Sequence, residues 1–158
     1  MKKTFLTFSC FVLTILFTVA GVYKSFHFDT KKLYSYEASS GVYDSKGSLI
    51  FNIGWNRSRP LSTTDLSKKI IDVFTEAEDS SFFYHSGFDP ISFMRAVFVN
   101  IKSGRIVQGG STISQQLIKI KYLSSEKTLV RKLKEVFLAL KMEQELNKKE
   151  ILTLYLNN

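Results

Sequence analysis

The most distinct feature of the hydrophobic pattern is an uncharged apolar run at residues 5–23. Its length approaches the roughly 20 residues that an α-helix needs to span a bilayer. Lys2 and Lys3 precede the run, and Lys24 follows it. We therefore predict an uncleaved transmembrane anchor, with a cleaved signal peptide as the alternative. The N-terminal positive charges predict that residues 1–4 stay in the cytoplasm and that the chain after the anchor lies outside it.

After this run the pattern becomes polar, then strand-like, then helical. Residues 24–40 are polar and mixed, which predicts a linker. Residues 41–53 predict two short strands around the turn sequence DSKG. From Ser62 a Ser-x-x-Asp start is followed by apolar residues with a helical period. This pattern predicts a first helix that ends at Glu78 and Asp79.

Two helices are predicted in the middle of the chain. One covers residues 90–102, with a proline in its first turn and Asp89 as its cap. The segment SGRIVQGG then interrupts regular structure. A second helix follows within residues 109–123, where Thr112 and Gln115 have the spacing of a capping box.

The C-terminal part of the sequence predicts two more helices. Residues 128–146 are strongly amphipathic, and Arg131 and Glu135 lie on one face at i,i+4 spacing, which is typical of surface ion pairs. Asn147 starts a last helix that runs to the end of the sequence. The residues expected to form the buried stripe of the longer helix are Leu129, Leu133, Val136, Phe137, Leu140 and Met142.

Composition changes this picture through charge. The 158-residue chain has an ordinary 44% of hydrophobic and 23% of charged residues, but its net charge is +8. Basic domains bind nucleic acid, anionic lipid surfaces or phosphorylated ligands. A membrane anchor argues against nucleic acid, so the lipid surface and the phosphorylated ligand remain. The sequence has no zinc-ligand spacing, no G-x-S-x-G elbow and no Walker loop.

Two short stretches are candidates for chemistry. In EDSSFFYHSGFD, Glu78 and Asp79 lie at the C-terminal end of a predicted helix, where the helix dipole is negative. The dipole and a neighbouring like charge make a carboxylate a better proton acceptor, and a solvated helix end is the alternative interpretation. In GGSTISQQ, Gly109 and Gly110 precede a helix start suited to an anion, with a plain capped helix as the alternative.

Four motifs occur in an order that resembles a known family. They are EDSSFFYHSGFD, GGSTISQQ, RKLKE and KKEILTLYLN. This order is similar to that of the family 51 peptidoglycan glycosyltransferases, the transglycosylase domains of bifunctional penicillin-binding proteins and of their monofunctional relatives. The resemblance covers residues 41–158, and the anchor fits it too. It implies a mainly α, lysozyme-like glycosyltransferase domain that begins with a short β-hairpin and is preceded by one transmembrane helix.

The resemblance implies an enzyme that polymerises lipid II, a disaccharide-pentapeptide on undecaprenyl pyrophosphate. The 4-hydroxyl of an incoming GlcNAc attacks the anomeric carbon of the chain's MurNAc, and undecaprenyl pyrophosphate leaves with inversion. Glu78 matches the family's general base, and Glu135 matches a second glutamate in the donor half of the site. One alternative is a non-catalytic membrane-anchored fragment that binds lipid II or cell-wall partners without turnover. A lysozyme-type hydrolase is a weaker alternative.

Other motif residues are implied to contact substrate. Asp79 would tune the base, Phe82 and His85 would shape the cleft, and Lys119 and Arg131 would meet the pyrophosphate. No cofactor or metal site is predicted as required, and a divalent cation, Mg or Mn, at the pyrophosphate stays open. The full set assigned to substrate binding is Asp79, Phe82, His85, Thr112, Gln115, Gln116, Lys119 and Arg131.

The resemblance also implies partners and a location. The expected partners are lipid II, the growing glycan strand, the cytoplasmic membrane and other cell-wall synthesis proteins, with no nucleic acid. The expected location is the bacterial cytoplasmic membrane, as a single-pass protein with its domain on the outer face. A basic domain on an anchor suits an anionic, lipid-linked substrate at that surface.

The sequence departs from the family pattern in two places. An asparagine commonly follows the matched lysine, whereas this chain has Ile120 there. The family also continues beyond YLN, so residues 41–158 are expected to form a domain that is incomplete at its C-terminus. Such a domain is expected to leave apolar helix faces uncovered, among them the face of EILTLYL.

Overall fold

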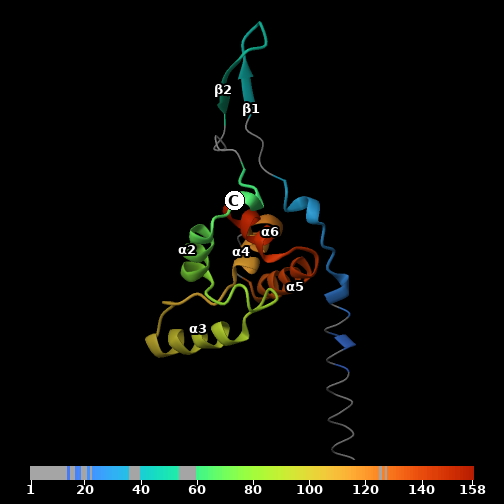
Figure 1. Cartoon of the computed structure of the whole chain (residues 1–158). Helices are drawn as coiled ribbons and strands as arrows, with labels where there is room; N and C mark the ends of the chain where they lie inside the picture. The colour runs from blue at the N-terminus through green and yellow to red at the C-terminus, as the bar shows by residue number, and fades with distance from the viewer. Residues whose placement is uncertain are drawn as a thin grey trace, which may run out of the picture.

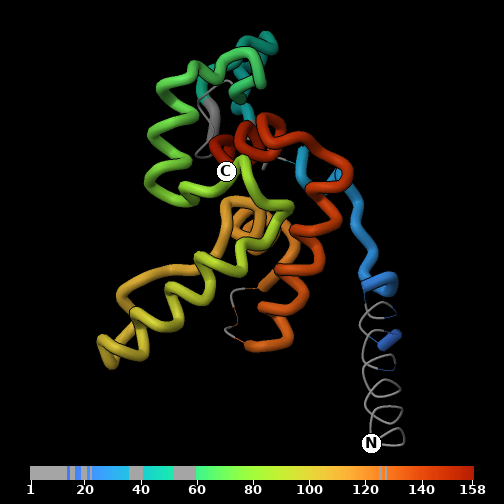
Figure 2. Tube along the Cα trace, turned by 60° about the horizontal axis from the view of Figure 1, so that its bottom comes forward, coloured from blue at the N-terminus to red at the C-terminus, as the bar shows by residue number. Residues whose placement is uncertain are grey.

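A computed structural model describes most of the chain after the predicted anchor, and within these residues the fold is mainly helical with one antiparallel strand pair (Figures 1 and 2). The predicted anchor, 5–23, lies largely outside the described residues. Inside them, no helix is both long enough and apolar enough to cross a membrane. The structure describes residues 14, 17–18, 21, 23–35, 40–53, 60–124, 126 and 128–158.

The predicted strand pair is confirmed. Strands β1 (Ser40–Tyr43) and β2 (Leu49–Ile53) pair antiparallel, and the hairpin extends away from the helices (Figure 1). The carboxylate of Asp44 accepts hydrogen bonds from the backbone N–H groups of two later turn residues. Gly47 takes a φ of 80°, a conformation that favours glycine. The turn chemistry of DSKG therefore fixes this hairpin.

The first long helix ends where the sequence predicts but begins later. Ser62 does form a capping box, but that box closes a short 3₁₀ turn, η2 (Thr63–Asp65). Leu66 is then extended, and α2 (Lys68–Glu78) starts behind a second cap at Ser67. The predicted start at Ser62 is wrong because two serine caps follow each other closely, and the first caps only a single turn.

The next two helices have the expected caps with one exception. Helix α3 (Pro90–Ser103) begins at Asp89, whose carboxylate accepts from two backbone N–H groups. Helix α4 (Ile113–Tyr122) begins at Thr112, whose hydroxyl accepts from Gln115 N. The return half of the expected capping box is not made, because the Gln115 side chain is buried and its oxygen accepts instead from Lys132.

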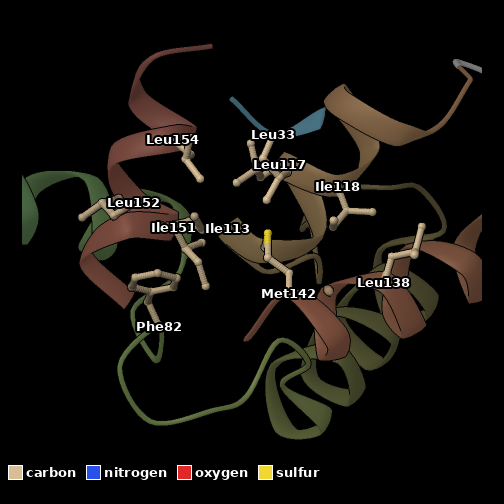
Figure 3. Packing of buried hydrophobic residues seen from close by; sticks show 11 residues of the cluster. Leu33, Phe82, Ile113, Leu117, Ile118, Leu138, Met142, Ile151, Leu152 and Leu154 are labelled. Atoms are coloured by element: carbon tan, nitrogen blue, oxygen red, sulfur yellow. The ribbon is translucent and has the colours of Figure 1, made fainter. Parts of the chain in front are cut away.

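The core lies where α4 packs against α5 (Leu129–Glu145) and α6 (Lys148–Leu156). Leu33, just after the short turn η1 (Thr30–Lys32), is fully buried with these helices, so part of the predicted linker belongs to the core. The buried cluster, most of which is shown in Figure 3, consists of Leu33, Phe82, Ile113, Leu117, Ile118, Leu138, Ala139, Met142, Ile151, Leu152 and Leu154.

The buried face of α5 differs from the predicted stripe. Leu129 and Leu133 are 86% and 59% exposed, so this part of the prediction is wrong. The core covers only the later turns of α5, whereas Arg131 and Glu135 in its first turns border a cleft. The fully or nearly buried residues of α5 are Glu135, Leu138, Ala139 and Met142.

The expectation of an uncovered apolar face on EILTLYL is also wrong. Ile151, Leu152 and Leu154 of α6 are all buried against α4 and its neighbours. Exposed apolar side chains lie on several other elements, and one group of them is on α3, which projects from the body in both views (Figures 1 and 2). The most exposed of these α3 residues are Ile91, Met94, Phe98 and Ile101.

Candidate active site

A polar cleft of about 740 Å³ opens between the end of α2, α3, the segment before α4, α4 itself and the first turns of α5. It brings together most of the site residues that the sequence predicts. Phe82, His85 and Gln115 do not line it. Those that line it are Glu78, Asp79, Thr112, Gln116, Lys119, Arg131 and Glu135.

Glu78, the last residue of α2, is exposed at one side of the cleft. Its Oε2 accepts a hydrogen bond from Gln116 Nε2 at 3.2 Å, and Gln116 Oε1 accepts from the Tyr155 hydroxyl at 3.2 Å. Partial burial raises the pKa of Tyr155, and the nearby charge of Glu78 adds to this effect. The hydroxyl therefore stays a donor to Gln116 and orients the amide so that its NH₂ group faces Glu78.

Glu135, in contrast, is only 2% exposed and is held by two cations of its own helix. Arg131 Nη1 donates to Glu135 Oε2 at 2.6 Å, and Lys132 Nζ donates to Glu135 Oε1. Lys132 Nζ also contacts Ser111 Oγ at 2.5 Å and Gln115 Oε1 at 3.1 Å. Both carboxylate oxygens of Glu135 are thus occupied by positive charge.

Lys132 is a residue of this site that the sequence analysis missed. It lines the cleft and connects α5 to the segment that leads into α4. Its i,i+3 spacing to Glu135 within RKLKE was a signal that was available. Arg95 of α3, which also lines the cleft, carries no such local signal, because only the tertiary fold brings α3 to this wall.

Lys119 is an exposed cation on α4 that faces the same cleft. No hydrogen bond or ion pair to it is seen within the described part of the chain. With Arg95, Arg131 and Lys132 it gives the cleft four cations from three helices. This arrangement suits an anionic group, since fixed positive charges stabilise negative charge best in a sheltered site.

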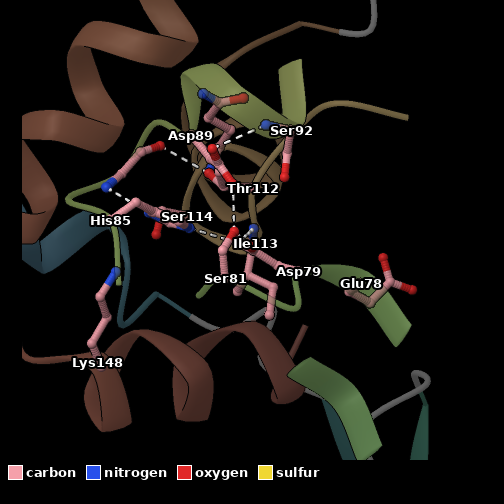
Figure 4. A network of polar contacts seen from close by, with 12 residues as sticks. Glu78, Asp79, Ser81, His85, Asp89, Ser92, Thr112, Ile113, Ser114 and Lys148 are labelled. Carbon is pink, nitrogen blue, oxygen red and sulfur yellow. Dashed lines mark hydrogen bonds and ion pairs between the residues drawn. The ribbon is translucent and has the colours of Figure 1, made fainter. Parts of the chain in front are cut away.

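Asp79 at the cleft wall and His85 behind it form a buried layer of polar contacts (Figure 4). Asp79 Oδ2 accepts from Ile113 N at 3.0 Å and lies 2.9 Å from His85 Nε2. Gly87 N donates to His85 Nδ1 at 3.1 Å, so the imidazole proton belongs on Nε2, which donates to Asp79. Asp79 therefore fastens the end of α2 to the start of α4, while Glu78 lies apart from this layer.

Phe82, the remaining site residue predicted in the first motif, also lies below the surface. Phe82 is fully buried, and its ring meets the His85 ring edge-on at 6.2 Å between centroids. Ser81 donates to the carboxylate of Asp89, which caps α3. This hydroxyl and the other hydrogen bonds hold the pKa of Asp89 well below its usual range. The loop from α2 to α3 is thus fixed by polar contacts as well as by packing.

The part of the chain that the structure describes offers no protein cage for a metal. Within the described ranges, no three His, Cys, Asp or Glu side chains are grouped so that they could hold an ion. Glu135, the buried carboxylate of the cleft, already has both oxygens occupied by cations. A divalent cation at the pyrophosphate stays open, and its ligands would have to come mainly from the phosphates.

Comparison with known proteins assigns this helical, cleft-bearing chain to a class. The family model described as transglycosylase matches residues 46–158, and the chain belongs to this family, the family 51 peptidoglycan glycosyltransferases.

The chain is similar to several penicillin-binding proteins. It is 47% identical to penicillin-binding protein 1A of Aquifex aeolicus over 119 residues, which are 75% of this chain and 16% of that protein. It is 43% identical to penicillin-binding protein 1A of Haemophilus influenzae over 145 residues, 92% of this chain and 16% of that protein. With penicillin-binding protein 1F of Bacillus subtilis it shares 37% identity over 162 residues, 99% of this chain and 22% of that protein. The chain therefore spans less than a quarter of the length of these relatives.

Proposed function

We propose that this chain carries a peptidoglycan glycosyltransferase site that polymerises lipid II into glycan strands and releases undecaprenyl pyrophosphate. The observation that carries the proposal is a single cleft with an exposed glutamate, Glu78, and a cation cluster around a buried glutamate, Glu135. Membership of the transglycosylase family and similarity to proteins named penicillin-binding protein support the same activity in cell-wall synthesis.

Glu78 is the residue of this cleft best suited to act as general base. Among the described contacts it accepts one hydrogen bond, through Oε2, so Oε1 is open to a proton from the acceptor sugar. Glu135 is unsuited to this role because cations occupy both of its oxygens. The acceptor 4-oxygen bonds to the anomeric carbon as its proton passes to Glu78. The bond from that carbon to the pyrophosphate breaks, and the leaving group keeps the electron pair.

The cations of the cleft are proposed to bind the leaving pyrophosphate. Lys119 and Arg95 face the cleft, and Arg131 and Lys132 are held in place by Glu135. Arg131 and Lys132 share the single carboxylate of Glu135, so these three residues together keep a net positive charge. Preorganised positive charge stabilises the negative charge that develops on the departing phosphate.

The location and partners follow from the same proposal. The domain would have a lysozyme-like fold and would lie on the outer face of the bacterial cytoplasmic membrane, held by the anchor predicted at 5–23. Lipid II, the growing strand, the membrane and other cell-wall proteins would be its partners. The net charge of +8 supports contact with an anionic lipid-linked substrate.

The test is lipid II polymerisation by the detergent-solubilised chain. We expect Glu78→Gln to lower the rate by about 10² to 10⁴, the usual contribution of a general base. Asp72→Asn is the matched control, since Asp72 is an exposed carboxylate of α2 whose ion pair with Lys68 lies on the surface. No glycan from a wild-type chain that circular dichroism shows to be folded would refute the proposal and favour the non-catalytic alternative.

A further inference from the structure

A second ion pair lies behind the cleft and has no part in the mechanism above. Glu143 near the end of α5 is 4% exposed in its side chain, and Lys148 at the start of α6 is 21% exposed. Lys148 Nζ contacts Glu143 Oε1 at 2.7 Å and Oε2 at 2.5 Å. Neither residue lines the cleft. Such a pair is weak evidence of stabilisation, because desolvation offsets much of the attraction.

Glu143 lies next to the buried layer formed by Asp79 and His85. Ser114 Oγ at the start of α4 donates to Glu143 Oε1. The same oxygen lies 4.0 Å from His85 Nδ1. Glu143 therefore bonds to the first turn of α4, whose Ile113 N–H holds the Asp79 carboxylate, and it lies near the His85 ring without bonding to it.

Lys148 adds a further contact to this layer. Its Nζ lies 4.5 Å from the centroid of the Phe82 ring, a cation–π distance. Phe82 in turn packs against His85. Figure 4 shows Lys148 in the same part of the network as His85, away from Glu78. The ion pair thus contacts the loop from α2 to α3 through Lys148 and the start of α4 through Glu143.

We propose that Glu143 and Lys148 are positioning residues for glycosyl transfer. Their ion pair holds the start of α4 through Ser114 and packs against Phe82 beside His85, and through Asp79 it fixes where the end of α2 presents Glu78. This inference rests on the proposed function. A displacement of about 1 Å at a reacting group can cost about 100-fold in rate, so loss of the brace lowers kcat without removing any group that contacts substrate.

The deciding variant is the double substitution Glu143→Gln with Lys148→Met. Removing one partner leaves an uncompensated buried charge, whereas replacing both is often neutral for stability. We expect a Tm close to that of the wild type, a kcat between about 10- and 100-fold lower, and a KM within about twofold. The matched control is Lys68→Met with Asp72→Asn, which neutralises a surface pair of α2 and is expected to leave kcat unchanged.

Hydrogen exchange separates this inference from the proposed function. The N–H groups of Ile113 and Gly87 donate to Asp79 and His85, so both are expected to exchange faster in the double variant. Unchanged protection of both amides overturns the inference even if the wild-type chain makes no glycan. An unchanged kcat in a folded double variant overturns it as well.

A milder variant covers the case in which the double variant does not fold. Ser114→Ala removes the hydroxyl donor to Glu143 and leaves the ion pair intact. We expect smaller changes than in the double variant, namely a lower kcat, an unchanged KM and faster exchange of the Ile113 N–H. Wild-type values for both kcat and exchange in Ser114→Ala would overturn the proposed route from Glu143 to Asp79.

Discussion

Replacing Gly87 by alanine perturbs the loop under the cleft at its tightest point. Gly87 has a φ of 96°, a conformation that residues with side chains rarely adopt. An added Cβ would lie 2.8 Å from Ala139 O and 2.9 Å from Ala139 C, which are backbone atoms of α5. The backbone of Gly87 also donates to His85 Nδ1 and accepts from Thr112 Oγ1, so a shift there disturbs both contacts.

Gly104 provides a matched control for the strain. It also has a positive φ, 62°, but an added Cβ would meet no atom within 4 Å. Gly104→Ala is therefore expected to lower the free energy of unfolding only by the conformational cost, about 1–2 kcal/mol. Gly87→Ala adds an overpacking cost of about 1–3 kcal/mol, for a total of about 2–5 kcal/mol.

The comparison is made by thermal unfolding of the two variants and the wild type. The extra cost at Gly87 corresponds to a Tm about 2–12 °C below that of Gly104→Ala for a domain of this size. We also expect Gly87→Ala alone to abolish polymerisation, because it moves His85 and Thr112. Equal Tm losses in the two variants would show that α5 yields to the methyl group and would refute the steric argument.

Three further substitutions test separate parts of the site. Lys132→Met removes one of two cations from buried Glu135, so thermal unfolding should show a loss of about 1–3 kcal/mol, together with slower polymerisation. Tyr155→Phe frees the amide of Gln116 to turn and should lower kcat several-fold while costing about 0.5–1.5 kcal/mol of stability; unchanged kcat would contradict this orienting role. The pKa of Asp89 is lowered, so its contribution to stability is complete above its ordinary pKa of 3.8 and is lost as the pH falls below that value. The free energy of unfolding, measured as the pH is lowered through this region, should therefore depend less on pH in Asp89→Asn than in the wild type.

Features set by local chemistry were predictable from the sequence. The hairpin follows from its turn residues, and the starts of α3 and α6 follow from the caps Asp89 and Asn147. The start of α2 was not predictable, because Ser62 and Ser67 are both competent caps. Only the extended backbone at Leu66 decides that the first cap closes a single turn.

Features set by packing were not predictable in the same way. A helical period shows that α5 is amphipathic, but it does not show which turns the core covers, and Leu129 and Leu133 are exposed as a result. For the same reason the burial of Glu135 was not predicted, because its i,i+4 spacing to Arg131 is typical of surface ion pairs. The side chain of Gln115 followed its tertiary partner Lys132 rather than the local capping box.

Glu78 and Asp79 show why sequence order alone does not tell the proposed general base from the carboxylate that holds the fold. The two carboxylates are adjacent and of similar chemistry, yet the first is exposed and the second is 8% exposed. The cause is the end of α2: Glu78 is the last helical residue, and Asp79 leaves the helix with φ −161° and ψ 78°. That turn directs Asp79 to Ile113 and His85 and leaves Glu78 facing the cleft. Asp79 thus uses its hydrogen bonds to hold the fold, and Glu78 is left as the exposed carboxylate that we propose for proton transfer.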